Sequence, residues 1–136
     1  MSKNEEELRI KICEKLSNNL IRKNFVDGCI CDVDLENGIF TLIIKTLVKV
    51  DNEDIDKIKN DNEISNELLN KYFERGINKI VKNLKEFFGD FHIIKTELYN
   101  IFNLIFLVNN NFLELSYYII IKVNENYLNK LKLSFL

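Results

Sequence analysis

The feature that most constrains the fold of this chain is residues 62–88, whose pattern predicts one long amphipathic helix. At about 100° per residue, its apolar positions cover roughly 180° of the helix circumference. These positions are Leu69, Tyr72, Phe73, Gly76, Ile77, Ile80, Val81, Leu84, Phe87 and Phe88. We expect one sheet to cover less than this, so the surplus apolar surface is predicted to contact a second subunit.

The predicted dimer interface is the central part of this apolar side. Gly76 at its middle would let two such helices cross closely, because glycine has no side chain. The residues assigned to the interface are Leu69, Tyr72, Phe73, Gly76, Ile77, Ile80 and Leu84. On the opposite side, lysines and Arg75 alternate with Glu67, Glu74 and Glu86, which is typical of a solvated face with helical ion pairs.

Length and composition indicate a single domain spanning residues 1–136. The chain is 46% hydrophobic and 29% charged, as in an ordinary globular protein. Its formal net charge is −2, whereas proteins that bind nucleic acid or anionic lipid usually present a basic surface. We therefore expect no nucleic-acid partner.

The cysteines and the N-terminus indicate the compartment. Cys13, Cys29 and Cys31 are odd in number and suggest no disulfide framework, so we expect reduced thiols. Residues 1–7 lack the apolar core of a secretory signal, and no stretch reaches the roughly 18 apolar residues of a membrane span. The sequence therefore predicts a cytoplasmic protein without membrane insertion.

Other helix signals lie on either side of the long helix. Residues 4–22 predict a first helix, and Ser2 followed by Glu5 is a capping-box pattern for its start. Its apolar stripe consists of Leu8, Ile12, Cys13, Leu16 and Leu20. Residues 51–61 indicate a single helical turn, and Gly89 is a natural C′ residue for the end of the long helix.

A β-hairpin is predicted after the first helix, with strands at residues 28–35 and 39–50. The Asn37-Gly38 pair between them is typical of a type I′ turn, which needs positive φ at both central residues. In that register Cys31 lies opposite Ile44, and the apolar residues of both strands share one side of the sheet.

The second half of the chain predicts three more strands, at residues 91–98, 99–108 and 112–123, and a final helix at 124–136 capped by Asn124. The last two strands are apolar on both faces, so both are expected in the middle of the sheet, with residues 117–121 at its centre. The predicted element order is α-β-β-α-β-β-β-α. This is an α+β fold, a five-stranded antiparallel sheet with helices on both faces.

Two segments carry a family resemblance. Residues 28–33, a glycine followed by an apolar strand, lead to the Asn37-Gly38 turn, and residues 123–133 leave a strand for a helix of alternating basic and apolar residues. Together with the element order, these segments resemble the Roadblock (dynein light chain) family of the Roadblock and longin superfamily. The similarity covers nearly the whole chain.

The resemblance implies a single Roadblock-like domain, with the first and last helices on one face of the sheet and the long helix on the other. Members of that family pair through the long helix and the adjacent edge strand. They act as scaffolds or regulators of Ras-like GTPases and as motor subunits, without chemistry of their own. A dimer with itself or with a paralogue, binding a small GTPase, is therefore implied.

No metal site is predicted. Cys13, Cys29, Cys31 and His92 are potential zinc ligands, but their spacing lacks paired Cys-x2-Cys motifs, so the cysteines are interpreted as small buried hydrophobes. Residues 32–38 are similar to a calcium loop only superficially, because glycine and glutamate do not fall at the sixth and twelfth positions.

No catalytic or cofactor-binding residues are predicted either. His92 is interpreted as a structural histidine, because nothing in the sequence places a cysteine nucleophile and an orienting group beside it. Glu97 and Glu114 lie on predicted strands without a partner motif for acid–base catalysis. The glycines are too scattered for a phosphate-binding loop.

The sequence therefore predicts a cytoplasmic, non-catalytic homodimeric adaptor that binds or regulates a small Ras-like GTPase. The alternative is a secretion-type or general peptide-binding chaperone dimer, because small acidic α+β dimers with a similar order of elements bind extended peptides. A third interpretation, a phage or toxin-system inhibitor, stays open because such proteins often lack motifs.

Overall fold

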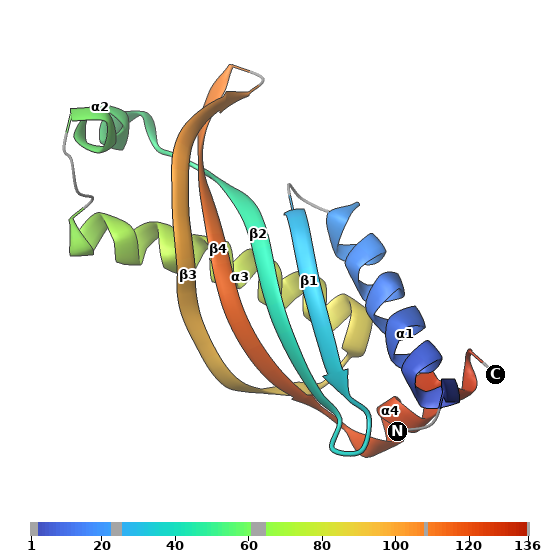
Figure 1. The fold of residues 1–136 in the computed structure, drawn as a ribbon. Helices are drawn as coiled ribbons and strands as arrows, with labels where there is room; N and C mark the ends of the chain where they lie inside the picture. Colours follow the sequence, from blue (N-terminus) through green and yellow to red (C-terminus); the bar gives the residue numbers. More distant parts are fainter. Residues whose placement is uncertain (1–2, 23–25, 61–64, 108, 136) are drawn as a thin grey trace.

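The computed structural model describes residues 3–22, 26–60, 65–107 and 109–135. Along the chain it contains α1 (Lys3–Ile21), β1 (Val26–Asp34), β2 (Ile39–Lys49), α2 (Asn52–Asn60), α3 (Asn66–Phe88), β3 (Phe91–Leu107), β4 (Asn110–Val123) and α4 (Glu125–Leu133) (Figure 1). The described strands form one antiparallel sheet in the order β1-β2-β4-β3. The predicted α+β class is confirmed.

The prediction of five strands is wrong, because residues 91–98 and 99–107 form a single strand, β3. The sequence has no turn signal at Leu98 and Tyr99, where the two strands were expected to meet. The strand instead shifts its register against β4 at three points along its length. Within the described residues the element order is α-β-β-α-α-β-β-α, and the segment expected to hold one helical turn is the helix α2.

β4 lies inside the sheet, whereas β3 lies at its edge. Residues 117–121 of β4, predicted as the sheet centre, pair with β2 on one side and with β3 on the other. The expectation that both strands of this hairpin are interior is wrong for β3, which has no second strand partner in the described part of the chain. Its apolar sequence is therefore not explained by burial between two strands.

The helices pack on one face of the sheet, which contradicts the prediction of helices on both faces. Side chains of α1, α3 and α4 join the inward side chains of β2 and β4 in one hydrophobic core. Fully buried members include Ile12, Leu16, Leu20, Phe40, Leu42, Ile44, Tyr72, Ile80, Leu84, Phe88, Tyr117 and Ile121. The strands lie in front of α3 in Figure 1, so the viewer looks onto the opposite face, which no helix of the described residues covers. We call this the open face.

Contacts across the core place each helix on the same face. The ring of Phe88 on α3 lies 4.8 Å from the ring of Phe40 on β2 and 6.0 Å from that of Tyr127 on α4. Cys13 on α1 is bonded to Cys31 on β1, whose strand partner Leu42 belongs to the same core. Periodicity predicted that each helix buries one side, but it carries no information about which sheet face receives that side.

The first hairpin keeps the predicted faces but not the predicted register. Cys31 lies opposite Leu42, two residues from the expected partner. The turn spans residues 35–38, and only Gly38 in it has a positive φ, of 68°. The carboxylate of Asp34 accepts hydrogen bonds from the turn backbone, and its own carbonyl accepts one from the Gly38 N–H at 2.8 Å. A longer turn closed by Asp34 replaces the type I′ turn.

The predicted helix ends are largely confirmed. Gly89, with φ 72°, ends α3 and donates its N–H to the Lys85 carbonyl. Asn124 caps α4 by accepting a hydrogen bond from the Asn126 N–H at 2.8 Å. Ser2, the predicted cap of the first helix, and residues 62–64, the predicted start of the long helix, lie outside the described residues. None of the described helices combines the length and the apolar character needed to cross a membrane.

Candidate functional site

Most of the predicted dimer-interface residues are buried by their own sheet. Tyr72, Gly76, Ile77, Ile80 and Leu84 are buried, and only Leu69 and Phe73 are half-exposed. The outward side of α3 is polar. The sheet therefore covers most of the predicted interface. The half-exposed apolar side chains of α3 are Leu68, Leu69, Phe73, Val81 and Phe87.

Gly76 permits a close approach within the subunit. A Cβ atom at this position would lie 2.0 Å from Tyr117 Oη and 3.0 Å from Val48 Cγ2, both on the core face of the sheet. Tyr117 Oη donates a hydrogen bond to the Phe73 carbonyl at 3.0 Å. The space left by the missing side chain is therefore filled by a tyrosine hydroxyl of the same chain.

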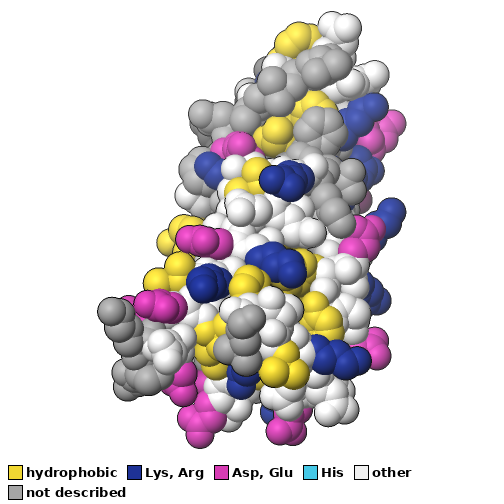
Figure 2. Space-filling view, turned by 90° about the vertical axis from the view of Figure 1, so that its right-hand side faces the viewer, with side chains coloured by type: hydrophobic (Ala, Val, Ile, Leu, Met, Phe, Trp, Pro, Cys, Tyr) yellow, Lys and Arg dark blue, Asp and Glu magenta, His cyan; other side chains and the backbone are white. Residues whose placement is uncertain are grey.

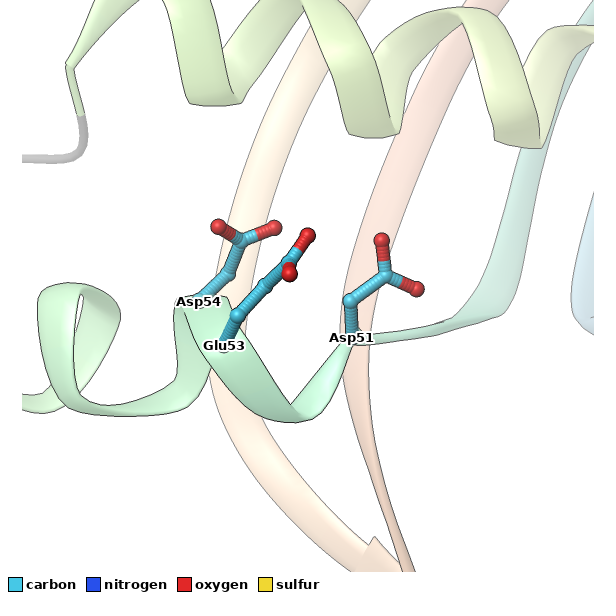
Figure 3. A group of neighbouring side chains, drawn as sticks. All are labelled: Asp51, Glu53 and Asp54. Atoms are coloured by element: carbon cyan, nitrogen blue, oxygen red, sulfur yellow. The ribbon is translucent and has the colours of Figure 1, made fainter.

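Three acidic side chains gather where β2 leads into α2. Asp51, Glu53 and Asp54 point toward α3 (Figure 3), and each offers an oxygen within 4.8 Å of the others. Lys71 of α3 already fills this cluster, because its Nζ lies 2.8 Å from Asp51, 2.7 Å from Asp54 and 3.7 Å from Glu53. The ammonium group takes the position that a metal ion would need, so we assign no metal here.

Two further α3 side chains complete this contact. Arg75 donates to both carboxylate oxygens of Asp51, at 2.9 and 3.2 Å. Tyr72 Oη donates to Asp54 Oδ2 at 2.5 Å and accepts from the Asp51 N–H at 3.0 Å. We call Asp51, Asp54, Lys71, Tyr72 and Arg75 the α2–α3 clamp. It holds the short helix α2 against the first half of α3.

The pKa shifts within the clamp favour a structural role and not proton transfer. Hydrogen bonds from Arg75 and from Lys71 hold the pKa of Asp51 well below its usual range. Hydrogen bonds from Lys71 and Tyr72 also lower the pKa of Asp54. Burial and the hydrogen bond to Asp54 raise the pKa of Tyr72 to about 12. Each of these shifts moves the pKa away from neutrality, whereas an acid–base catalyst needs one near it.

Sequence reasoning missed the clamp, although a signal was present. Lys71 and Arg75 lie four residues apart, on the side of the helix that the sequence predicts to be solvated. Their partners, Asp51 and Asp54, follow directly after a strand and precede a short helix. An acidic pair at such a junction, combined with a basic pair one turn apart on the next helix, is a pattern that predicts helix docking.

The cysteines are not all reduced, as the sequence had predicted, because Cys13 and Cys31 form a disulfide with a Cα–Cα distance of 5.5 Å. Cys29 is the free thiol, and burial raises its pKa above the usual value. His92 lies on β3, at the opposite edge of the sheet from β1. The structure therefore does not bring the potential zinc ligands together, nor a cysteine and the histidine.

A shallow groove of about 410 Å³ lies between α1 and β1, next to the disulfide. Its lining includes Ile10, Cys13 and Ser17, and an ion pair between Arg9 and Asp32 at 2.6 Å lies at its side. Figure 2 shows the side of the molecule that carries α1, where acidic, basic and hydrophobic side chains are interspersed. Of the charged residues that line the groove, Glu6, Glu14 and Asp32 are acidic and Arg9 is basic.

The open face contains one buried acidic group. Glu114 of β4 is only 9% exposed, and burial, followed by a hydrogen bond with Asp27, raises its pKa. Lys45 of β2 lies 3.9 Å from its Oε1. Glu97, the other acid considered from the sequence, is exposed and pairs with Lys95 on β3. Glu114 is therefore paired with a second carboxyl group, whereas Glu97 is paired with a lysine.

Apolar side chains make up much of the rest of the open face. Ile30, Ile39, Ile43, Tyr118 and Ile120 alternate along their strands with the core residues, and Ile30 is 67% exposed. Exposed apolar surface rimmed by polar groups usually marks a protein-interaction site.

The edge strand β3 also exposes apolar side chains. Among its described side chains, the large exposed ones are Ile93 at 42%, Ile94 at 52%, Tyr99 at 62% and Phe106 at 65%. The open face and β3 are therefore the apolar surfaces on which a binding function can be built.

No protein-family model matches the chain, and no curated protein matches its sequence. The sheet of the described residues also has four strands, whereas the Roadblock resemblance implies five. Membership of that family stays a prediction from the sequence.

Proposed function

We propose that this protein is a non-catalytic adaptor that acts as a homodimer and binds another protein through the open face of its sheet. The observation that carries the proposal is the placement of α1, α3 and α4 on the other face, which leaves Ile30 67% exposed and Ile43 and Tyr118 half-exposed on the open face. An apolar sheet face of this kind gains stability when a partner removes it from water.

The charged groups of the described residues fit this proposal. The α2–α3 clamp fixes its carboxylates in ion pairs, and the Cys13–Cys31 disulfide is remote from His92. What the chain presents to its surroundings is mainly apolar and mixed-charge surface, which suits recognition of a protein more than chemistry on a small substrate.

The partner class that the sequence resemblance implies is a small Ras-like GTPase. The test is binding of the purified protein to a panel of such GTPases, each loaded with GDP and with a GTP analogue. Binding that Ile30→Asp weakens and Ile10→Asp leaves intact would support the open face, because both isoleucines are exposed but Ile10 lies on α1. Absence of binding across the panel would overturn the GTPase proposal.

A peptide-binding chaperone is the second candidate, because an edge strand such as β3 can add an extended segment by backbone hydrogen bonds. It predicts capture of unfolded, apolar peptides and no preference for nucleotide state. Titration with a permanently unfolded peptide, compared with a folded protein of similar charge, separates the two candidates.

A further inference from the structure

We propose that the outer edge of β1, together with the side of α1 next to it, binds an extended basic segment of another protein as an additional strand. The segment would pair with β1 through backbone hydrogen bonds and pack on α1. The edge of β1 is a different surface from the open face, so this inference goes beyond the proposed adaptor function.

The edge of β1 can accept another strand. Within the described residues its strand partner is β2, which lies on one side of it. On the other side of an edge strand, backbone N–H and C=O groups point outward and can pair with a further strand. In Figure 1, α1 runs beside β1 on the side away from β2. An added strand would therefore have a helix to pack against.

Two hollows lie along this edge, and Arg9 and Asp32 line both of them. The first is the groove of about 410 Å³ described above, and the second, of about 250 Å³, is lined by residues 32–36 and by α1. The α1 residues of the first hollow run from Glu6 to Asn18. At 1.5 Å per residue this is about 18 Å, the length of about five to six residues of an extended strand. We call the two hollows together the α1–β1 groove.

The α1–β1 groove concentrates acidic side chains. Its lining contains a single basic residue, Arg9, which pairs with Asp32 at 2.6 Å. The whole chain has a formal net charge of only −2, so this local excess is not a property of the composition. An occupant with lysine or arginine side chains is complementary to it. The acidic residues of the lining are Glu5, Glu6, Glu14, Asp32, Asp34 and Glu36.

Apolar side chains lie at both faces of this edge. Ile10 of α1 lines the groove and is 53% exposed, and Ile30 of β1 lies on the open face and is 67% exposed. Alternate side chains of an added strand point to opposite faces of the sheet. One set would contact α1 near Ile10, and the other would lie beside Ile30 and Asp32. The segment that fits best is therefore basic, with apolar residues between the basic ones.

The same charges disfavour the β1 edge of a second copy as the occupant. Asp27, Asp32 and Asp34 are exposed on β1, and like charges on paired strands are destabilising. The acidic groups that would repel another β1 attract a basic strand. The occupant is therefore a different protein segment, and its chemistry is set by the charge of the groove.

The disulfide holds the groove in shape. Cys13 and Cys31 both line it, and their bond joins α1 to the edge strand. A binding surface that is already in its bound conformation loses less conformational freedom when a partner arrives. The α1–β1 groove is therefore preformed for an extended segment.

The first experiment tests charge recognition with a labelled peptide of alternating arginine and valine, about seven residues long, by fluorescence anisotropy. The wild type should bind it with micromolar affinity and should not bind the same peptide with glutamate in place of arginine. The variant Glu6→Lys/Glu14→Lys should bind at least about tenfold more weakly, because it reverses two charges of the groove.

The matched control is Glu67→Lys/Glu74→Lys on α3. Glu6 and Glu67 both lie in the first turn of their helices, Glu14 and Glu74 lie further along, and all four are exposed. The control changes the net charge equally and should keep the wild-type affinity. Equal weakening in both variants, unchanged affinity in Glu6→Lys/Glu14→Lys, or no binding by the wild type would overturn the groove as the site.

The second experiment tests strand pairing. Two versions of the arginine–valine peptide carry N-methyl groups on alternate residues, one version on the odd positions and the other on the even positions. Only one of these sets directs its N–H groups toward β1, so one version should lose binding and the other should keep it. Hydrogen exchange of the complex should show added protection in β1 and none in β3. Equal affinity of the two versions would indicate attraction without strand pairing and would overturn the proposal.

The groove and the adaptor function can fail separately. Peptide binding that Glu6→Lys/Glu14→Lys weakens, in a protein that binds no GTPase, would support the groove and leave the open face without its proposed partner. GTPase binding that Ile30→Asp weakens, in a protein that binds no basic peptide, would overturn the groove and support the adaptor.

Discussion

α3 and β3 are the longest helix and the longest strand of the described chain, and both are rich in apolar residues. They differ in how far those residues are buried within the subunit. The core-facing residues of α3, such as Leu84 and Gly76, are covered by the sheet of the same chain. β3 lies at the sheet edge, and side chains such as Tyr99 stay exposed. The apolar content of an element predicts that it needs a contact. Its position in the sheet decides whether that contact lies inside the subunit.

The two edges of the sheet also differ in how they are attached to the rest of the subunit. At the β1 edge, α1 packs on the strand and the Cys13–Cys31 disulfide joins them covalently. At the β3 edge, the described residues provide no such attachment, and three register shifts interrupt the strand. The β1 edge therefore belongs to the stable part of the subunit, and the β3 edge belongs to a less constrained part.

The largest expected effect comes from breaking the disulfide. Cys13 and Cys31 are 18 residues apart, and a cross-link of that span stabilises a protein by about 3 kcal/mol. Reduction, or Cys13→Ser, should lower the free energy of unfolding by about that amount and reduce hydrogen-exchange protection in α1 and β1 but not in β3. Chemical denaturation with and without reductant measures it.

The control for the disulfide is Cys29→Ser, which should keep the full response to reductant. Detection of three free thiols in the native protein, with no effect of reductant on stability, would instead support the reduced cysteines expected from the sequence.

The next effect tests the covered side of α3. Gly76→Ala should lower the free energy of unfolding by about 2 to 3 kcal/mol, because the added methyl group would collide with the Tyr117 hydroxyl and with Val48. Gly28→Ala is a matched control, since the nearest atom to its Cβ would be Lys45 Cε at 3.8 Å. If Gly76→Ala kept the stability but dissociated a dimer, the helix crossing predicted from the sequence would be correct.

Sequence reasoning succeeded where a local signal decides the structure. Gly89 and Asn124 end and begin helices as predicted, because cap geometry depends on a few neighbouring residues. It failed at residues 98–99, where one strand continues without a turn, and at the hairpin register. There the Asp34 carboxylate closes a longer turn than Asn37-Gly38 suggested.

The candidate site was harder to predict, because the open face exists only where the helices leave the sheet uncovered. The open face results from the packing of α1, α3 and α4 on the same side of the sheet. The clamp depends on a contact between Asp54 and Lys71, which are 17 residues apart in the sequence. Both are consequences of tertiary packing. The β3 residues are apolar in the sequence, and an apolar strand predicts burial on both faces, whereas β3 lies at the sheet edge.

A smaller effect, of the opposite sign, is expected on the covered side of α3. Asn83 is fully buried, and neither polar atom of its side chain has a hydrogen-bond partner among the described residues. Asn83→Leu should therefore raise the free energy of unfolding by about 1 kcal/mol, because it removes an unsatisfied buried amide. Asn78→Leu, at an exposed position of the same helix, is the control. A loss of stability in Asn83→Leu would indicate that the amide has a role in packing.

The α2–α3 clamp should appear in the acid limb of the stability curve. Because the carboxyl pKa values of Asp51 and Asp54 are lowered in the folded state, the clamp contributes stability above the unfolded value of about 3.9 and loses it as pH falls through the folded values. Lys71→Met should flatten this loss, as measured by denaturation between neutral pH and about pH 2. Lys95→Met, whose partner Glu97 is exposed, should leave the acid limb unchanged.

The smallest expected change in stability is on β3, and it tests whether the exposed side chains of this strand contribute to the fold of the subunit. Tyr99→Ala should alter the free energy of unfolding by less than about 0.5 kcal/mol when measured on the monomer, because the side chain is 62% exposed at an open edge. A large loss of stability in dilute monomer would mean that the outer side of β3 is already used within the subunit. In that case α3 and β3 would not differ in the way described above.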